Sequence, residues 1–328
     1  ATAESWSDRR PSRTLHIAPP GVSVTVTLVG DSLIDELAPG MLAARQPPSD
    51  FHLWAFDGAG SGMSPPQPPW PETAYRARDE VAGWTDPPLL AAFDTAHATV
   101  SAIDLNAGAG VQWQRDAAKM APWEGGAPLR QLVRWALSRS GAHLIHAAAV
   151  GDEAGGVLLI GRGGSGKSTS ALAALAAGMR FVADDYTVVR VGAQITAHPA
   201  FGIAKATPAS LALIAGLDDR ADGARADWQG KLRLPVGDIV DPALPLRAIV
   251  WPEVSARTGA PTRVEPADVM REAAISTLFQ LAGGADLTLE VLSTLIERLP
   301  VFRLEVGPDI ERVPERLAEA IRLGAAVA

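Results

Sequence analysis

The stretch that decides the fold is Gly161-Arg162-Gly163-Gly164-Ser165-Gly166-Lys167-Ser168, which fills every fixed position of the pattern G-x-x-x-x-G-K-[ST]. The apolar run 157–160 before it is typical of a buried strand, and the Ala- and Leu-rich run 169–177 after it is typical of a helix. Gly178 is a helix stop signal. Strand, glycine-rich loop and helix in this order predict a loop that binds the phosphates of a nucleotide.

The residue types in this loop suit a polyphosphate ligand. Glycines allow successive backbone N–H groups to point inward at the N-terminus of a helix, and such an arrangement binds anions. Lys167 is expected to reach the β- and γ-phosphates, and the Ser168 hydroxyl is expected to bind Mg²⁺. The residues predicted to contact the nucleotide are Gly161, Gly163, Gly164, Ser165, Gly166, Lys167, Ser168 and Thr169.

Composition limits the classes of function. Of the 328 residues, 47% are hydrophobic and 20% are charged, which is typical of a soluble globular protein. A net charge of −8 argues against nucleic acid as a partner, because phosphate backbones bind basic surfaces. The absence of cysteine excludes disulfides and thiolate chemistry. The sequence shows no membrane-spanning run and no secretory signal, so we expect a cytoplasmic protein. Residues 1–13 are polar and are expected to be disordered.

Residues 1–123 are predicted to form a β-rich region. A helix is expected over 31–45, capped by Asp31 or Ser32, and the Gly- and Pro-rich run 58–71 is expected to be a loop. No catalytic pattern occurs in this part of the sequence, so we interpret it as a recognition or scaffold region. Its strands are predicted over 22–29, 51–56, 97–104 and 110–115.

Residues 124–328 are predicted to form the nucleotide-binding catalytic domain, with helices and strands in an α/β arrangement. A helix over 128–140 ends at Gly141, and the strand 143–150 forms a hairpin with the strand before the loop. Residues 217–230 are expected to be a mobile polar loop. Further strands are predicted over 179–183, 186–189, 231–235, 246–251 and 301–306, and further helices over 207–215, 266–282, 286–298 and 308–322.

Two adjacent acids, Asp184 and Asp185, end the strand that follows the loop's own helix. Neighbouring residues at a strand end point in different directions, so one carboxylate can hold Mg²⁺ while the other faces a phosphoryl acceptor. Transfer of a phosphoryl group to an alcohol needs this pairing of in-line positioning and a proton acceptor. His146, on the strand 143–150, is expected to fold close to the pair. A solvated Asp-Asp turn and a buried core histidine are the alternative interpretations.

Lysine is rare in this chain, because Lys119, Lys167, Lys205 and Lys231 are its only four among 29 basic residues. A lysine is a compact point charge that suits a phosphate or an acidic substrate. Lys205 and Lys231 are therefore candidates for substrate binding, with ordinary surface lysines as the alternative interpretation.

His146, the loop 161–168 and Ala183-Asp184-Asp185, in this order and spacing, resemble the catalytic domain of HPr kinase/phosphorylase, the bacterial kinase that phosphorylates a serine of a small carrier protein. The resemblance covers residues 140–192. It implies an α/β phosphate-loop kinase core related to phosphoenolpyruvate carboxykinase, with ATP and Mg²⁺ as cofactors and a serine acceptor. By matching positions, it implies that Lys167 neutralises the phosphates, Ser168 and Asp184 hold Mg²⁺, Asp185 accepts the proton, and His146 and Asp184 support that role.

Two departures from this family bear on the substrate. The glycine-rich signature that follows the acid pair in HPr kinases has no match in 190–206, and residues 1–123 do not resemble the N-terminal part of those enzymes. Both departures argue against HPr as the substrate and against phosphorylase activity. The chain is more similar to HPr-kinase-like proteins found beside peptide-modification genes, some of which phosphorylate lasso-peptide precursors.

The sequence therefore favours an ATP- and Mg²⁺-dependent kinase that transfers the γ-phosphoryl group to a hydroxyl, expected to be a serine of a peptide or protein. A kinase of a free small-molecule hydroxyl and a nucleotide-binding regulatory protein without transfer activity are the alternatives. The sequence leaves open the acceptor, the choice of ATP over GTP, homo-oligomerisation and which of the two aspartates is the base.

Overall fold

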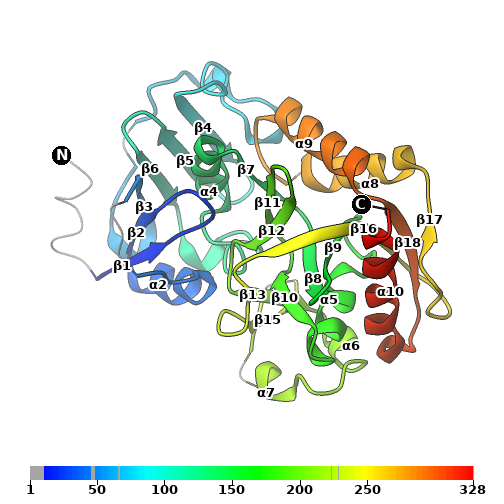
Figure 1. Ribbon diagram of the computed structural model, residues 1–328. Coiled ribbons are helices and arrows are strands. Elements are labelled where there is room, and N and C mark those ends of the chain that lie inside the picture. The colour runs from blue at the N-terminus through cyan, green and yellow to red at the C-terminus, as the bar shows by residue number, and fades with distance from the viewer. Residues whose placement is uncertain are drawn as a thin grey trace. The chain divides into compact units, whose positions relative to one another are not determined.

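The computed structural model describes residues 11–45, 49–65, 67–222, 224–227, 229–278 and 280–327 as a mixed α/β protein with several sheets (Figure 1). The chain divides into two compact units, of which the first is Ala1–Gly141 with Leu281–Gly284 and the second is Ala142–Gln280 with Ala285–Ala328. The division falls later than the predicted boundary between 123 and 124, because helix α4 belongs to the first unit. The recognition and catalytic roles assigned to 1–123 and 124–328 stay predictions.

The first unit is built on a six-stranded sheet in the order β1-β2-β3-β6-β5-β4. Strands β2, β3 and β6 run parallel to one another, and the other neighbours are antiparallel. Helix α2 makes the crossover that two parallel neighbours such as β2 and β3 require. The elements are β1 (Ser12–Ile17), β2 (Val24–Val29), α2 (Asp31–Leu37), η1 (Ala38–Gly40), β3 (Phe51–Asp57), α3 (Gly58–Ser61), η2 (Glu72–Ala74), η3 (Ala77–Asp79), β4 (Leu89–Asp94), β5 (Thr99–Asp104), β6 (Ala109–Gln114), η4 (Ala117–Lys119), α4 (Arg130–Leu137) and η5 (Ser138–Ser140).

The second unit contains a nine-stranded sheet and a three-stranded sheet. The larger sheet has the order β10-β8-β9-β16-β12-β11-β7, with β18 beside β16 and β17 beside β18, and the smaller has the order β13-β15-β14. Its elements are β7 (Ala142–Ile145), β8 (Ala148–Asp152), β9 (Gly155–Leu159), α5 (Lys167–Ala176), β10 (Arg180–Ala183), β11 (Thr187–Val191), β12 (Ile195–Pro199), β13 (Ile203–Ala206), α6 (Pro208–Leu211), α7 (Asp218–Ala221), β14 (Arg225–Ala226), β15 (Leu232–Pro235), β16 (Leu244–Val254), β17 (Thr262–Arg263), α8 (Pro266–Leu278), α9 (Ala285–Arg298), β18 (Val301–Val306), η6 (Ile310–Arg312) and α10 (Val313–Ala325).

Helices cover both faces of the nine-stranded sheet. On one face Leu172 of α5 and Leu317 of α10 pack against β9, together with Leu234 of the three-stranded sheet. On the other face, which α8 and α9 cover in Figure 1, a second core contains Val269 of α8 and Leu295 of α9. Because β9, β16 and β18 are parallel and buried between these layers, they read in the sequence as continuous apolar runs. This layering holds the end of β9, where the glycine-rich loop begins, in a fixed place.

Two predicted elements have different limits in the structure. The helix predicted over 31–45 ends at Leu37, because Pro39 cannot continue the hydrogen-bonding pattern and the chain turns through η1. Gly30 occupies the N-cap position instead of Asp31 or Ser32, so the predicted cap is wrong. The single strand predicted over 143–150 is two strands, because β7 pairs with β11 whereas β8 pairs with β9 and β10.

Other differences concern loops and the N-terminal segment. Ser12 and Arg13, predicted to be disordered, belong to β1 and pair with β2, whereas 1–10 lie outside the described residues. The predicted loop 217–230 contains the short elements α7 and β14, and the predicted loop 58–71 contains the helical turn α3. Strand β4 was not expected from the sequence. Among the described residues, no helix combines the length and the apolar character that crossing a membrane requires.

The two leucines of α10 differ in burial, so their substitution should change the stability of the protein by different amounts. Leu317 is fully buried, whereas Leu323 of the same helix is 42% exposed. We expect Leu317→Ala to lower the free energy of unfolding by about 2–5 kcal/mol, because a cavity adds to the lost burial. The matched variant Leu323→Ala should cost less than about 1 kcal/mol. Urea unfolding followed by circular dichroism measures both values, and equal losses would contradict the packing of α10.

Candidate functional site

The glycine-rich loop joins the end of β9 to the start of α5. Gly161, Gly164 and Gly166 have φ values of +142°, +82° and +103°, a region that L side chains avoid. At Gly161 a Cβ atom would also lie 2.8 Å from the Ser165 hydroxyl oxygen. Gly166 caps α5 without a side-chain hydrogen bond, so the first N–H groups of the helix face the loop without a protein cap. The loop therefore has a backbone that glycine adopts more readily than other residues, directly before the N-terminus of α5.

Lys167 lies inside the curve of this loop. Its Nζ donates hydrogen bonds to the carbonyl oxygens of Gly161 at 2.6 Å and Arg162 at 3.0 Å. Burial lowers the pKa of Lys167, while the negative charges of Asp185 and Asp184 act against that decrease. The structure thus brings both predicted acids within electrostatic range of the loop lysine.

Asp184 is a buried carboxylate with one oxygen in a hydrogen bond. Its Oδ2 accepts from the backbone N–H of Lys205 at 2.9 Å, and among the described residues Oδ1 has no hydrogen-bond partner. Burial and then the charge of Asp185 raise the pKa of Asp184, whereas the nearby Ser168 hydroxyl acts in the opposite direction. A buried oxygen of this kind beside a serine hydroxyl fits a hard cation such as Mg²⁺.

No group of three or more His, Cys, Asp or Glu side chains that could hold a metal occurs in the part of the chain that the structure describes. Mg²⁺ commonly takes one or two carboxylates and completes its shell with water and nucleotide phosphates. Ser168 and Asp184 therefore fit an ion that arrives with the nucleotide.

Asp185 is held from two sides. Its Oδ1 lies 3.0 Å from His146 Nε2, and its Oδ2 lies 3.3 Å from Lys205 Nζ, whose side chain is 9% exposed. The backbone of Asp185 has φ +66°, a left-handed conformation that residues other than glycine adopt rarely. A carboxylate offers about four lone-pair positions, so Asp185 can accept a further hydrogen bond or a proton.

A chain of hydrogen bonds fixes the orientation of His146. The Tyr186 hydroxyl donates to Gln280 Oε1 at 2.5 Å, which turns the Gln280 amide nitrogen toward His146 Nδ1 at 3.1 Å. Because the Asp185 carboxylate can only accept, His146 Nε2 carries the hydrogen that it donates to Asp185 Oδ1. The Ser276 hydroxyl also lies 2.5 Å from Nδ1.

Several residues of the site were not found from the sequence. Ser276 of α8 and Gln280 follow His146 by about 130 residues, and no motif marks them. Glu272 of the same helix forms an ion pair with Arg162 of the loop at 2.8 Å, and no motif marks it either. Lys205 differs from these residues, because the rarity of lysine marks it in the sequence as a candidate for substrate binding.

The predicted site residues have different positions in the structure. Lys167 lies within electrostatic range of Asp184 and Asp185, Ser168 lies beside Asp184, and His146 contacts Asp185. His146 differs from expectation in one respect, because it lies at the break between β7 and β8 and not within a strand. The Thr169 hydroxyl donates a hydrogen bond to the Ser210 hydroxyl at 3.1 Å. At Gly163 a Cβ atom would meet no atom within 4 Å, so lack of space does not require glycine at this position.

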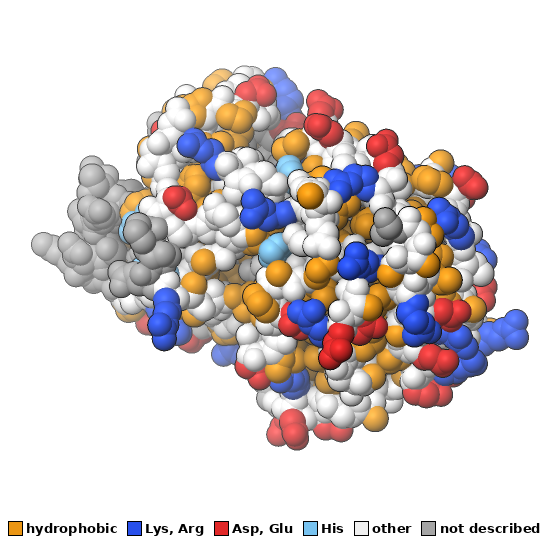
Figure 2. All heavy atoms as spheres, in the orientation of Figure 1, with side chains coloured by type: hydrophobic (Ala, Val, Ile, Leu, Met, Phe, Trp, Pro, Cys, Tyr) orange, Lys and Arg blue, Asp and Glu red, His pale blue; other side chains and the backbone are white. Residues whose placement is uncertain are grey.

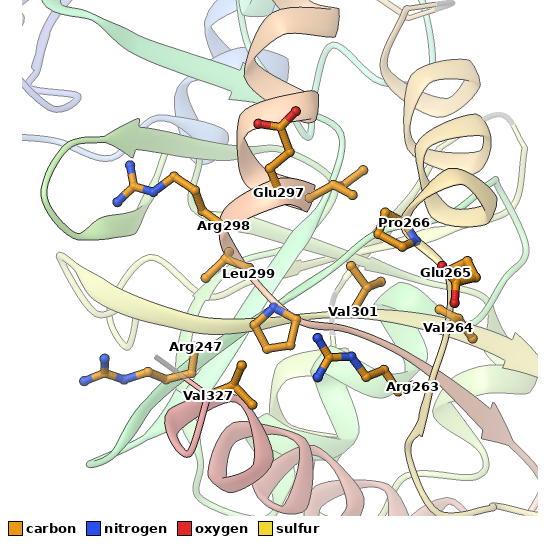
Figure 3. A pocket seen from close by; sticks show the side chains of 12 residues that line it. Arg247, Arg263, Val264, Glu265, Pro266, Glu297, Arg298, Leu299, Val301 and Val327 are labelled. Carbon is orange, nitrogen blue, oxygen red and sulfur yellow. The ribbon is translucent and has the colours of Figure 1, made fainter.

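A cavity of about 690 Å³ lies elsewhere on the second unit (Figure 3). Its lining includes the starts of β16 and β18, whereas the loop follows the end of β9, which runs parallel to β16. Arg247 and Arg298 extend away from Arg263, and they donate to backbone carbonyls of Ala154 and of Gly192 and Ala193. This cavity is therefore separate from the site around Asp185.

Comparison with known proteins gives a distant likeness in structure. The chain matches no protein-family model and no curated protein. The Hpr(Ser) kinase/phosphatase from Coxiella burnetii is similar over 56% of this chain and 97% of its own chain, with 16% sequence identity and a TM-score of 0.29. At this TM-score the likeness assigns neither a family nor an activity, and the resemblance seen in the residue order stays a prediction.

The raised pKa of Asp184 predicts that the negative charge of this residue lowers the stability of the fold. An acid whose pKa is higher in the folded than in the unfolded chain destabilises the fold increasingly as pH rises from 3.8 to the raised value. Asp184→Asn removes this penalty and keeps an oxygen for the Lys205 N–H, so the variant should be more stable than wild type at neutral pH. The advantage should shrink as pH is lowered through the raised pKa of Asp184 toward 3.8, because the carboxyl group then becomes neutral in the folded wild type as well.

Thermal unfolding of the protein without nucleotide measures this difference. Asp268→Asn, at an exposed position of α8, is the control and should behave like wild type throughout. An Asp184→Asn advantage that stays constant with pH, or a loss of stability at neutral pH, would contradict the account of this carboxylate.

Proposed function

We propose that this protein is an ATP- and Mg²⁺-dependent kinase that transfers the γ-phosphoryl group to the hydroxyl of a serine in a peptide or protein. The observation that carries the proposal is the placement of Asp185, which is oriented by His146 and Lys205 within electrostatic range of the loop lysine Lys167. A buried acid with a raised pKa next to a second acid that is specifically paired, both close to a glycine-rich loop, is typical of catalytic sites.

The proposed step needs few groups. The hydroxyl oxygen of the acceptor attacks the γ-phosphorus, the bond from that phosphorus to the bridging oxygen breaks, and ADP leaves with the electron pair. The hydroxyl proton passes to Asp185, whose orientation is fixed by the hydrogen bond from His146 Nε2. Lys167 and the loop N–H groups would hold the β- and γ-phosphates and stabilise the charge that develops on them.

Two further residues of the site would hold the metal. Ser168 and Asp184 would hold Mg²⁺, which neutralises phosphate charge when bound. The raised pKa of Asp184 reflects an environment in which its negative charge lacks a full partner, and a cation beside Oδ1 would supply one.

A nucleotide-dependent switch without transfer is the second candidate. The ion pair between Arg162 of the loop and Glu272 ties the loop to α8, and α8 also carries Ser276, which contacts His146. Occupancy of the loop could thus reach His146 through this helix. Turnover separates the two candidates, because a switch binds nucleotide and transfers nothing.

Direct transfer is the first test. Purified protein incubated with Mg²⁺ and ATP should convert a serine-containing peptide to a product heavier by one phosphoryl group, detected by mass spectrometry. The same reaction with free serine-type metabolites tests the small-molecule alternative. Steady ATP hydrolysis with no transfer to any hydroxyl in either panel would count against the proposal.

Asp185→Asn tests the assigned base. Loss of the proton acceptor should lower kcat by about 10²–10⁴-fold, while the dissociation constant of the Mg²⁺ complex of a non-hydrolysable ATP analogue changes by less than about threefold. Asp268→Asn is the matched control and should retain full activity. Equal turnover of wild type and Asp185→Asn would remove Asp185 from the reaction.

A further inference from the structure

The three-stranded sheet beside α5 carries a row of basic side chains. Lys205 of β13 lies directly opposite Arg233 of β15, and Arg233 lies directly opposite Arg225 of β14. Residues directly opposite on antiparallel strands project from the same face of a sheet. The structure therefore lines up three cationic residues across three neighbouring strands.

One end of this row is at the proposed active site. Lys205 Nζ contacts Asp185 Oδ2, so the face that carries the row is the face turned toward Asp185. Lys205 and Arg233 are buried, whereas Arg225 is exposed, so the row leads from the site to the protein surface. Lys231, just before β15, adds a fourth charge close enough to lower the pKa of Lys167.

The row concentrates positive charge in a protein that is acidic as a whole. Like charges directly opposite one another in a sheet destabilise the pairing, and this protein has a net charge of −8, with basic and acidic side chains intermixed on the face in Figure 2. Two of the chain's four lysines nevertheless lie in or beside this row, and a third is Lys167 of the loop. A cationic row leading into a catalytic site is the arrangement expected for binding an extended anion.

We infer that the row Lys205–Arg233–Arg225 binds acidic residues of the peptide that carries the accepting serine. The inference rests on the proposed kinase function and names its substrate class. The row starts at Asp185, the group assigned to the acceptor, and not at the phosphate loop, which favours the acceptor over the nucleotide as the ligand. Arginine guanidinium groups bind carboxylates through paired hydrogen bonds.

The geometry sets the length of the acidic segment. Neighbouring strands lie about 4.8 Å apart, so the row extends about 10 Å from Lys205 to Arg225. An extended peptide advances about 3.3 Å per residue, so the acidic residues should lie within about three positions of the serine. A compact anion such as inorganic phosphate would reach only one end of the row.

Two synthetic peptides test this inference by binding, without turnover. One has a serine with three glutamates on each side, and the other has glutamines in their place. With Mg²⁺ and a non-hydrolysable ATP analogue present, fluorescence anisotropy should give the glutamate peptide about tenfold higher affinity for the wild-type protein. Arg225→Gln should remove most of this preference and leave the affinity for the ATP analogue unchanged.

The controls separate this inference from the kinase proposal. Arg263→Gln, an exposed arginine of the same unit, should keep the full preference. Equal affinity for both peptides, or an Arg225→Gln variant that loses ATP-analogue affinity and keeps the peptide preference, would overturn the inference. Equal phosphorylation of both peptides would overturn it while the kinase proposal stands. Tight binding of the glutamate peptide with no transfer to any hydroxyl would leave the acidic-peptide site in place and refute the kinase.

Discussion

The site depends on the mutual compensation of buried charges. Lys167, Asp184 and Lys205 are all almost inaccessible to water. Asp185 forms an ion pair with Lys205, and its negative charge also acts on Lys167. Charges removed from water are costly unless each has a partner of opposite sign and good geometry. Asp185 satisfies this condition through Lys205 and His146, whereas Asp184 satisfies it only in part, which is why the pKa of Asp184 is raised. Their arrangement is therefore a property of the whole group and not of a single pair.

The two aspartates differ because their surroundings differ. Asp184 continues from β10 into the core, where its Oδ2 accepts a backbone N–H and its Oδ1 stays without a hydrogen-bond partner in the described part of the chain. Asp185 adopts a left-handed backbone and is paired with two side chains, His146 and Lys205. Burial destabilises the charge on the first, and direct pairing supports the charge on the second. Adjacent residues of the same type can therefore take separate roles, one toward a cation and one toward a proton.

The sequence predicts the part of the site that is local in the chain. The loop is marked by glycines that its backbone requires, and the acid pair is marked by its position at a strand end. Contacts that join distant segments carry no such mark, so Ser276 and Gln280 could be found only after α8 was placed beside His146. The row that ends at Arg225 is not predicted from the sequence either. Arg225 lies in the polar segment 217–230, whose low β propensity predicts a loop, and only the pairing of β14 with β15 places Arg225 opposite Arg233. Pro39 ended a helix whose apolar pattern continued, which shows backbone chemistry overriding periodicity.

The central claim is that the nucleotide's terminal phosphate lies between the loop and the aspartate pair. A crystal structure with Mg²⁺ and a non-hydrolysable ATP analogue tests it most directly. The account predicts that the triphosphate contacts the backbone N–H groups of 161–168 and Lys167, that the metal touches Ser168 and Asp184, and that Asp185 faces the γ-phosphate. Density for the nucleotide away from this loop, or both carboxylates turned toward bulk solvent, would contradict the account.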